Sequence, residues 1–236
     1  MRYAICSYKI TQEIENNLMK LGLCPVKLYG CTQFGEYHPL SYHPDMFCFK
    51  LRDNTWIFYE SAYKNNQEIL DNFGLDIITV TDPISGEYPH YIGLNCARVG
   101  KYLICAAKYT HPLIVGDDAL GVPPFNDFEI IDVKQGYAGC STCVVRDAII
   151  TADRGIYEKF PNEKLLIEAG HIDLYGYNYG FIGGCTGYFD DKLLFTGDIK
   201  LHPDYKKIKD CCNCQGVELV SLSQERLKDY GGILIV

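Results

Sequence analysis

The sequence lacks several features that define large classes of protein. Lysine and arginine form no block anywhere in the 236 residues, and the formal net charge is −8. Because binding to phosphate backbones ordinarily needs a basic stripe, this charge argues against a nucleic-acid partner. No run of about 18 apolar residues occurs, so we expect no membrane-spanning helix and no membrane partner.

Two further absences narrow the function. The first residues, MRYAICSYKITQEI, lack the long apolar core of a signal peptide, and we therefore expect a cytoplasmic protein. No glycine-rich phosphate pattern precedes a predicted helix, so we expect no nucleotide and no other cofactor. The composition, 47% hydrophobic and 22% charged, is that of a soluble globular protein, and we expect one domain over residues 1–236.

Cysteine, in contrast, is abundant, with twelve residues. Without an export signal, reduced thiols are expected rather than a disulfide framework. Most lie in apolar runs and are interpreted as small hydrophobic residues. Cys140 and Cys143 form a C-x-x-C pair that could join the cysteines of residues 211–214 on zinc. Adjacent cysteines are poor partners on one ion, so we expect no metal site.

The strongest signal is internal repetition. Four segments share one plan, an apolar strand, a polar turn and a second apolar strand that ends in a charge. Their turn residues are Asn54, Gly100, Asp147 and Asp191, spaced 46, 47 and 44 residues apart. Their closing charges are Glu60, Lys108, Asp153 and Asp198, spaced 48, 45 and 45 apart. Two independent markers with one period predict a repeat architecture.

A helix or a shortened helix and a third strand are expected after each hairpin. SAYKNNQEILDNFG carries Ile69, Leu70 and Phe73 on one face and should end at Gly74. HPDYKKIKDCCNCQG should begin with Pro203 in its first turn and end at Gly216. The two segments between them are predicted to be mostly loop or only one to two helical turns.

The fifth unit is expected to be divided between the chain ends. The N-terminal part supplies a strand, the helix QEIENNLMKLG and a second strand, and YGGILIV supplies the remaining strand. Pairing of the first and last strands would close a ring and leave no open sheet edge. The sequence therefore predicts an α/β fold, a five-fold pseudosymmetric α/β propeller of ββαβ units.

Such a fold resembles the pentein superfamily of guanidino-group-modifying enzymes, which includes arginine and agmatine deiminases, dimethylarginine hydrolases and amidinotransferases. The segments GYAGCSTCVV, ITADRGI, GHIDLYGYNYGFIGGCTG and LFTGDIKLHPD further resemble an uncharacterised clostridial-type branch of that superfamily. This resemblance covers nearly the whole chain. It implies a site in which a cysteine thiolate attacks the guanidino carbon, a histidine moves protons, and carboxylates hold the guanidinium.

The resemblance nominates two histidine motifs. His43-Pro44-Asp45 opens the first hairpin 11 residues before its turn, which is the register that the enzymes would show. His171-Ile172-Asp173 matches the H-x-D pattern by its letters but lies 20 residues before its turn. The alternative for each histidine is a loop or capping role, and Asp45 could merely cap a turn.

Cys185 is the candidate nucleophile, although not by direct correspondence. The enzymes carry their cysteine in a glycine-rich stretch of the last unit, and the corresponding stretch here, YGGILIV, contains none. Cys185 lies in the equivalent strand of the preceding unit, where Gly183, Gly184 and Gly187 leave the backbone approachable. The alternative interpretation is a small residue packed beside the axis.

The closing charges are the candidate clamp, by which we mean the charged groups that would hold a guanidinium ligand. If the strand ends meet at the axis, Glu60, Asp153 and Asp198 would attract a small guanidinium-like ligand. Alternatively they cap the helices that follow. Three functions remain open: a hydrolase or transferase of a guanidino compound, a non-catalytic protein that binds a small cationic metabolite, and an adaptor for a protein partner.

Overall fold

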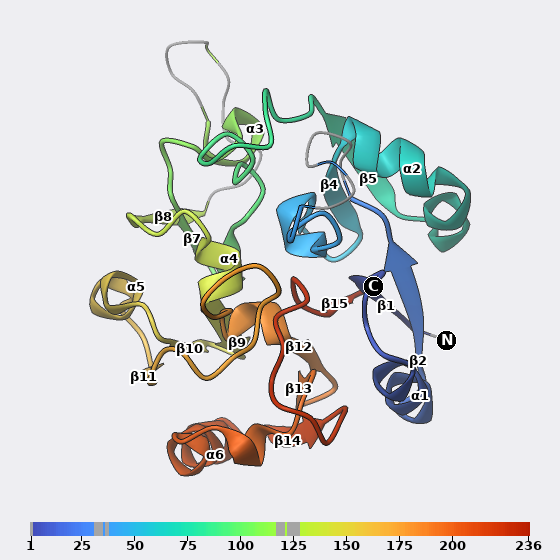
Figure 1. Ribbon diagram of the computed structural model, residues 1–236. Coiled ribbons are helices and arrows are strands. Elements are labelled where there is room, and N and C mark those ends of the chain that lie inside the picture. The colour runs from blue at the N-terminus through green and yellow to red at the C-terminus, as the bar shows by residue number, and fades with distance from the viewer. Residues whose placement is uncertain (1, 31–34, 36–37, 117–120, 122–127) are drawn as a thin grey trace.

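The computed structural model describes residues 2–30, 35, 38–116, 121 and 128–236. In these residues the chain forms five separate three-stranded sheets, arranged around a common centre (Figure 1). The sheets are β15-β1-β2, β3-β4-β5, β6-β7-β8, β9-β10-β11 and β12-β13-β14. Within each sheet the strands are named from the innermost to the outermost. The strand bounds are β1 Arg2–Ser7, β2 Leu23–Leu28, β3 Cys48–Lys50, β4 Thr55–Tyr59, β5 Asp76–Val80, β6 Ala97–Val99, β7 Tyr102–Cys105, β8 Glu129–Asp132, β9 Thr142–Val145, β10 Ala148–Thr151, β11 Lys164–Leu166, β12 Thr186–Phe189, β13 Lys192–Phe195, β14 Glu218–Ser221 and β15 Leu234–Ile235.

Every sheet has the same plan. Its first strand pairs antiparallel with the second, and the second pairs parallel with the third. A parallel pair needs a crossover, and a helix lies in each crossover. These helices are α1 Gln12–Lys20, α2 Glu60–Leu70, α3 Pro112–Val115, α5 Arg154–Lys159 and α6 Tyr205–Cys214. The five repeated units predicted from the sequence are therefore present.

The turns explain why the hairpins form where the sequence predicts them. Gly100 and Asp191 adopt positive φ angles of 55° and 58°, as the tight turns require. In the third hairpin the positive φ falls on Arg146, at 55°, rather than on the predicted Asp147. The turn position was therefore correct, whereas the residue that carries the left-handed backbone was off by one.

The closure of the ring is only partly as expected. β1 pairs antiparallel with β15, so the two chain ends do complete the fifth unit. The expectation that this pairing would leave no open sheet edge is wrong. The five sheets remain separate, and each keeps two edge strands rather than joining a closed barrel. The middle strand of each sheet is paired on both sides within its own unit, and no ladder joins one described sheet to the next.

The helices bury one face each, and the structure corrects the predicted inward face of α2 and the predicted start of α6. In α1, Thr11 caps the first turn by accepting from the Ile14 amide, and Ile14 packs into the core. In α2, Leu70 is buried, but Ile69 is 40% exposed, because the inward-facing stripe runs through Ala62 and Asn66 instead. Helix α6 begins two residues after Pro203, which lies in the preceding turn. Within the described ranges, no helix combines the length and apolarity needed to cross a bilayer.

The first strands of the five sheets surround a cavity of about 340 Å³, which we call the central channel. Residues of β3, β6, β9, β12 and β15 line it, and Asp45 lies in its wall near one end. Residues of the loops that precede these strands, such as Cys96, Gly139 and Gly183, also line the channel. Residues far apart in sequence are thereby brought to one place.

Candidate functional site

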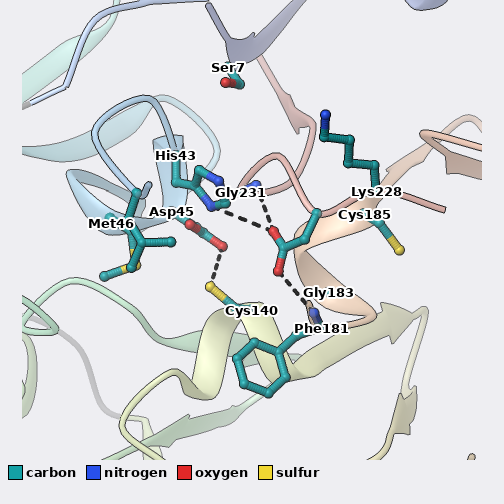
Figure 2. Close-up of polar contacts among 12 residues, drawn as sticks. Ser7, His43, Asp45, Met46, Cys140, Phe181, Gly183, Cys185, Lys228 and Gly231 are labelled. Atoms are coloured by element: carbon teal, nitrogen blue, oxygen red, sulfur yellow. Dashed lines mark hydrogen bonds and ion pairs between the residues drawn. The ribbon is translucent and has the colours of Figure 1, made fainter. Parts of the chain in front are cut away.

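The five loops before the first strands meet beside Asp45 in the wall of the central channel, and Figure 2 shows polar contacts among their residues. Four of them supply polar side chains in mutual contact or close approach, and the remaining loop, before β12, supplies the bare backbone of Gly184. We call the polar set the central cluster. It consists of His43, Asp45, Asn95, Cys140 and Asp229.

The shortest contact of the cluster joins a thiol to a carboxyl group. The Cys140 thiol donates to Asp45 Oδ2 at 2.9 Å, as Figure 2 shows. Asp45 belongs to the short 3-10 helix Pro44–Met46, and Cys140 belongs to α4, Ala138–Ser141. The other oxygen of the carboxyl group, Oδ1, is buried and has no hydrogen-bond partner in the described residues. It is therefore available to a ligand donor.

Asn95 connects the loop that carries Asp45 to the segment that carries Cys140. Its amide nitrogen donates to the Asp45 backbone carbonyl at 3.0 Å and lies 3.1 Å from Cys140 Sγ. Its carbonyl oxygen accepts from the Gly139 amide at 2.8 Å. Asn95 is 1% exposed, so these bonds replace the ones it would make with water.

Asp229, in the loop before β15, approaches the His43 imidazole. Asp229 Oδ1 lies 3.5 Å from His43 Nδ1, and both side chains are nearly inaccessible to solvent. The same carboxylate accepts from the Phe181 amide at 2.9 Å and from the Gly231 amide at 3.0 Å. Two backbone donors thus fix the carboxylate, while His43 Nδ1 keeps no hydrogen-bond partner in the described part of the chain.

Burial dominates the electrostatics of the cluster. Burial and the nearby Asp229 charge raise the pKa of the Asp45 carboxyl to about 7. Burial lowers the pKa of His43, although Asp229 opposes the shift, so the imidazole is neutral at pH 7. Burial and the two carboxyl groups raise the pKa of the Cys140 thiol well above its usual value. Without a ligand, the cluster therefore holds a thiol rather than a thiolate.

Two further cavities reach the cluster from outside the channel. One, about 220 Å³, has Cys140 and Asp229 in its wall and is otherwise formed largely by Tyr137, Tyr179 and Phe181; we call it the aromatic cavity. The other, about 400 Å³, contains His43 and Asp229 and is called the histidine cavity. A small molecule can thus approach the thiol, the imidazole and a carboxylate from neighbouring cavities.

The second histidine motif lies elsewhere. The His171 side chain is partly exposed, 3.5 Å from Glu168 and packed edge-on against the His202 ring. Asp173 is more than half exposed and lies 3.7 Å from Arg226. The structure therefore assembles His43 and Asp45 at the cluster and places His171 and Asp173 outside it, because the inserted loop carries the motif away from the strand start.

Cys185 is placed in the core. Its thiol is fully buried, donates to the Ile182 carbonyl at 3.2 Å and packs with Cys143 and Leu193. In Figure 2 its sulfur points away from Asp45 and Cys140. A small molecule cannot reach this sulfur without opening the core. The C-x-x-C pair is also divided, since Cys140 joins the cluster and Cys143 joins the core.

The four closing charges do not line the central channel. Glu60 is exposed and pairs with Lys64 in the first turn of α2, and Lys108 is exposed. Asp153 caps α5, and Asp198 caps the 3-10 helix Ile199–Leu201. The chain turns away from the centre at these positions, because the second strand of each sheet is not the innermost one. A clamp built from Glu60, Asp153 and Asp198 therefore has no geometric support in the described residues.

Asp153→Ala should reveal a capping role. Asp153 Oδ1 accepts from the Ile156 amide at 2.9 Å, and loss of such a cap costs about 1 kcal/mol. We expect that decrease in the urea-derived free energy of unfolding and a much smaller one for Asp153→Asn, which keeps an acceptor. The affinity for guanidines should stay unchanged in both variants, and a weakened affinity would restore the clamp.

Sequence reasoning missed Asn95, Cys140 and Asp229 as partners of His43. A signal for them exists, because Asp45, Asn95, Cys140, Gly184 and Asp229 lie 50, 45, 44 and 45 residues apart. This is the period of the hairpins, extended to the position just before each first strand. Of the described residues, no three of the histidine, cysteine, aspartate and glutamate type are placed to ligate one metal ion.

Comparison with solved structures places the fold. The amidinotransferase SxtG of Microseira wollei, from the saxitoxin biosynthetic pathway, is similar with a TM-score of 0.56 and 11% sequence identity, over 94% of this chain and 88% of the amidinotransferase. At this identity the likeness shows a shared fold, which agrees with the amidinotransferase-like fold expected from the sequence. No curated protein sequence matches the chain. Residues 5–234 match the family of unknown function DUF6873, and the chain belongs to that family.

Proposed function

We propose that the protein is a hydrolase or transferase that acts on a guanidino compound at the central cluster. The observation that carries this proposal is the Cys140 thiol, which is held against the Asp45 carboxyl group beside the His43–Asp229 pair. The shared fold with an amidinotransferase supports it. A cytoplasmic location and a single catalytic domain, both expected from the sequence, belong to the same proposal.

The charge of the cluster favours a cationic ligand. Neither Asp45 nor Asp229 forms an ion pair with a lysine or arginine in the described residues. Buried carboxylates that lack a cationic partner are costly, and a bound cation removes that cost. A guanidinium group presents several N–H donors in one plane, which suits the unpartnered Asp45 Oδ1.

The bound cation would also activate the thiol. A positive charge beside Cys140 opposes the carboxyl groups that raise the pKa of its thiol. Asp45 is hydrogen-bonded to this thiol, and its pKa of about 7 suits a base that accepts the proton at neutral pH. The role of nucleophile, assigned to Cys185 from the sequence, therefore passes to Cys140.

The reaction balances with these groups. The sulfur–carbon bond forms at the guanidino carbon, the bond from that carbon to the leaving nitrogen breaks, and the proton taken from the thiol goes to the leaving amine. Water in a hydrolase, or an acceptor amine in a transferase, then breaks the sulfur–carbon bond. The neutral imidazole of His43 can accept the proton of that second nucleophile, with Asp229 beside it.

A second candidate function is the non-catalytic binding of a small cationic metabolite. The high pKa of the buried Cys140 thiol favours it, and so does the absence of a cysteine from β15 and the residues beside it. The two functions share the carboxyl groups of Asp45 and Asp229. They differ in whether the bound ligand is turned over by Cys140 or only bound.

Binding and product assays with one matched pair of variants test the proposal. Thermal shift is used to screen arginine, agmatine, methylated arginines and creatine. A ligand that binds the folded state raises the melting temperature, and the increase grows with the ratio of ligand concentration to Kd. For each ligand that binds, the release of amine is measured in the wild type, Cys140→Ala and Cys185→Ala. Cys140→Ala should bind but lose turnover by more than about 1,000-fold, whereas Cys185→Ala should keep turnover per folded molecule.

Each failure has a distinct meaning. Binding without turnover by the wild type would favour the non-catalytic function. Turnover by Cys140→Ala would reject the assigned nucleophile. No thermal shift with any guanidine would reject a guanidinium site and leave the adaptor function.

A further inference from the structure

The central channel contains two cations that the proposed reaction does not use. Lys50 is the last residue of β3, and Arg98 lies in β6, and both line the channel. Because β3 leads away from Asp45, Lys50 lies at the end of the channel remote from the central cluster. The lining of the channel shares no residue with the aromatic cavity or the histidine cavity.

Both cations bind backbone carbonyls rather than a carboxylate of the described residues. The Lys50 amine donates to the Ile235 carbonyl at 2.8 Å, and the Arg98 guanidinium donates to the Leu51 carbonyl at 3.0 Å. Neither lies within ion-pair distance of a carboxylate among the described residues. Burial lowers the pKa of Lys50, the charge of Asp53 opposes this shift, and the nearby Arg98 charge adds to it. Two neighbouring cations that repel each other at a cavity wall are the arrangement that an anion relieves.

The rest of the wall is mainly apolar. It includes Phe49, Leu94 and Ile233, with the backbone of Gly187 and Gly232 between them. Thr142 also lines the channel, is 4% exposed, and has a hydroxyl without a hydrogen-bond partner in the described residues. A cavity of about 340 Å³ with apolar walls, a few polar groups and two cations remote from the Asp45 carboxyl group is typical of a site for a small organic molecule.

We propose that the central channel binds a small organic carboxylate, with its anionic end on Lys50 and Arg98 and its apolar body along the channel wall. Arginine offers paired N–H donors that match the two oxygens of a carboxylate, and lysine adds a second positive charge. The apolar walls disfavour a fully hydrated inorganic anion. Lys50 and Arg98 take no part in the proposed guanidino reaction, and Asp45 is the one residue of the central cluster that also lines the channel.

Benzoate and benzamide form a matched probe pair for this site, because they have the same shape and differ in charge. Titration of the full chain by isothermal calorimetry should give a benzoate Kd below about 1 mM and no measurable binding of benzamide. Arg98→Gln and Lys50→Met should each weaken benzoate binding by about 10-fold or more. Lys101→Met, which removes an exposed lysine in the turn of the same hairpin, should leave the benzoate Kd unchanged.

Several outcomes would overturn the proposal. Equal binding of benzoate and benzamide would show that charge is not recognised. A benzoate Kd unchanged in both Arg98→Gln and Lys50→Met would place binding elsewhere, and so would a loss in Lys101→Met. Inorganic phosphate that binds more tightly than benzoate and displaces it would indicate a surface anion site only. Unchanged melting temperatures of the variants without ligand exclude misfolding as the cause of a loss.

Discussion

Gly184→Ala is expected to destabilise the protein by roughly 3 kcal/mol or more, with a fall in melting temperature of about 10 °C. A Cβ atom on Gly184 would lie 2.0 Å from Asp229 Oδ1 and 2.4 Å from its Cγ. The carboxylate would have to move, and its bonds to the Phe181 and Gly231 amides would break or lengthen. Buried donors left without a partner are costly, so strain and lost hydrogen bonds add.

The control is a glycine whose added Cβ would make a much milder contact. Gly155 lies in α5, where a Cβ would approach Asp153 Oδ1 at 3.2 Å and alanine is the better helix former. Gly155→Ala should change the free energy of unfolding, measured in urea, by less than about 1 kcal/mol. Gly184 thus serves the site by giving the Asp229 carboxylate space.

A double variant decides whether the clash with Asp229 is the cause. Asp229→Ala alone should destabilise the protein, because two buried amides lose their acceptor. In the Asp229→Ala background, adding Gly184→Ala should cost little, since the oxygen it would meet is gone. Additive losses in the double variant would mean that Gly184 is needed for another reason.

Asp45→Asn is expected to change how stability depends on pH. The folded-state pKa of Asp45, about 7, lies above that of an unfolded aspartate, so the folded protein binds the proton more tightly. This contribution to stability is fully present below the unfolded pKa, near pH 4, and is lost as the pH rises through about 7. The loss amounts to at most about 1.4 kcal/mol per pH unit.

Urea unfolding of wild type and Asp45→Asn between pH 4 and 8 measures this effect. The stability of the wild type relative to the variant should decline across the range, while His43 and other groups contribute equally to both proteins. Parallel curves would show that Asp45 is ionised in the folded protein at acid pH. Because a bound cation favours the carboxylate, guanidine binding near pH 6 should also release a proton, which calorimetry in buffers of different ionisation enthalpy detects.

The pH dependence and the thiol chemistry are connected through one hydrogen bond. Cys140 donates to Asp45, so protonation of the carboxyl group removes the base for the thiol. Turnover of a guanidine substrate should therefore rise with pH through about 7. A site that only binds cations would show the same trend in affinity but no product.

The sequence by itself determined the repeat. The turn residues recur with one period because a tight turn favours residues such as Gly100 and Asp191, which tolerate a left-handed backbone, and this requirement is local. The same reasoning placed β15 beside β1. The family resemblance nominated His43-Pro44-Asp45, which lies just before β3. Local patterns of turns, caps and apolar runs were therefore sufficient for the units.

Only the tertiary structure decided which side chains meet. Cys140 and Cys185 both lie one or two residues before a first strand, yet the short helices that carry them direct one thiol to Asp45 and the other into the core. Asp229 carries no local motif, and its position depends on Gly184, 45 residues away in sequence. Side-chain direction at a loop is set by packing against other loops, and no pattern within one unit specifies that packing.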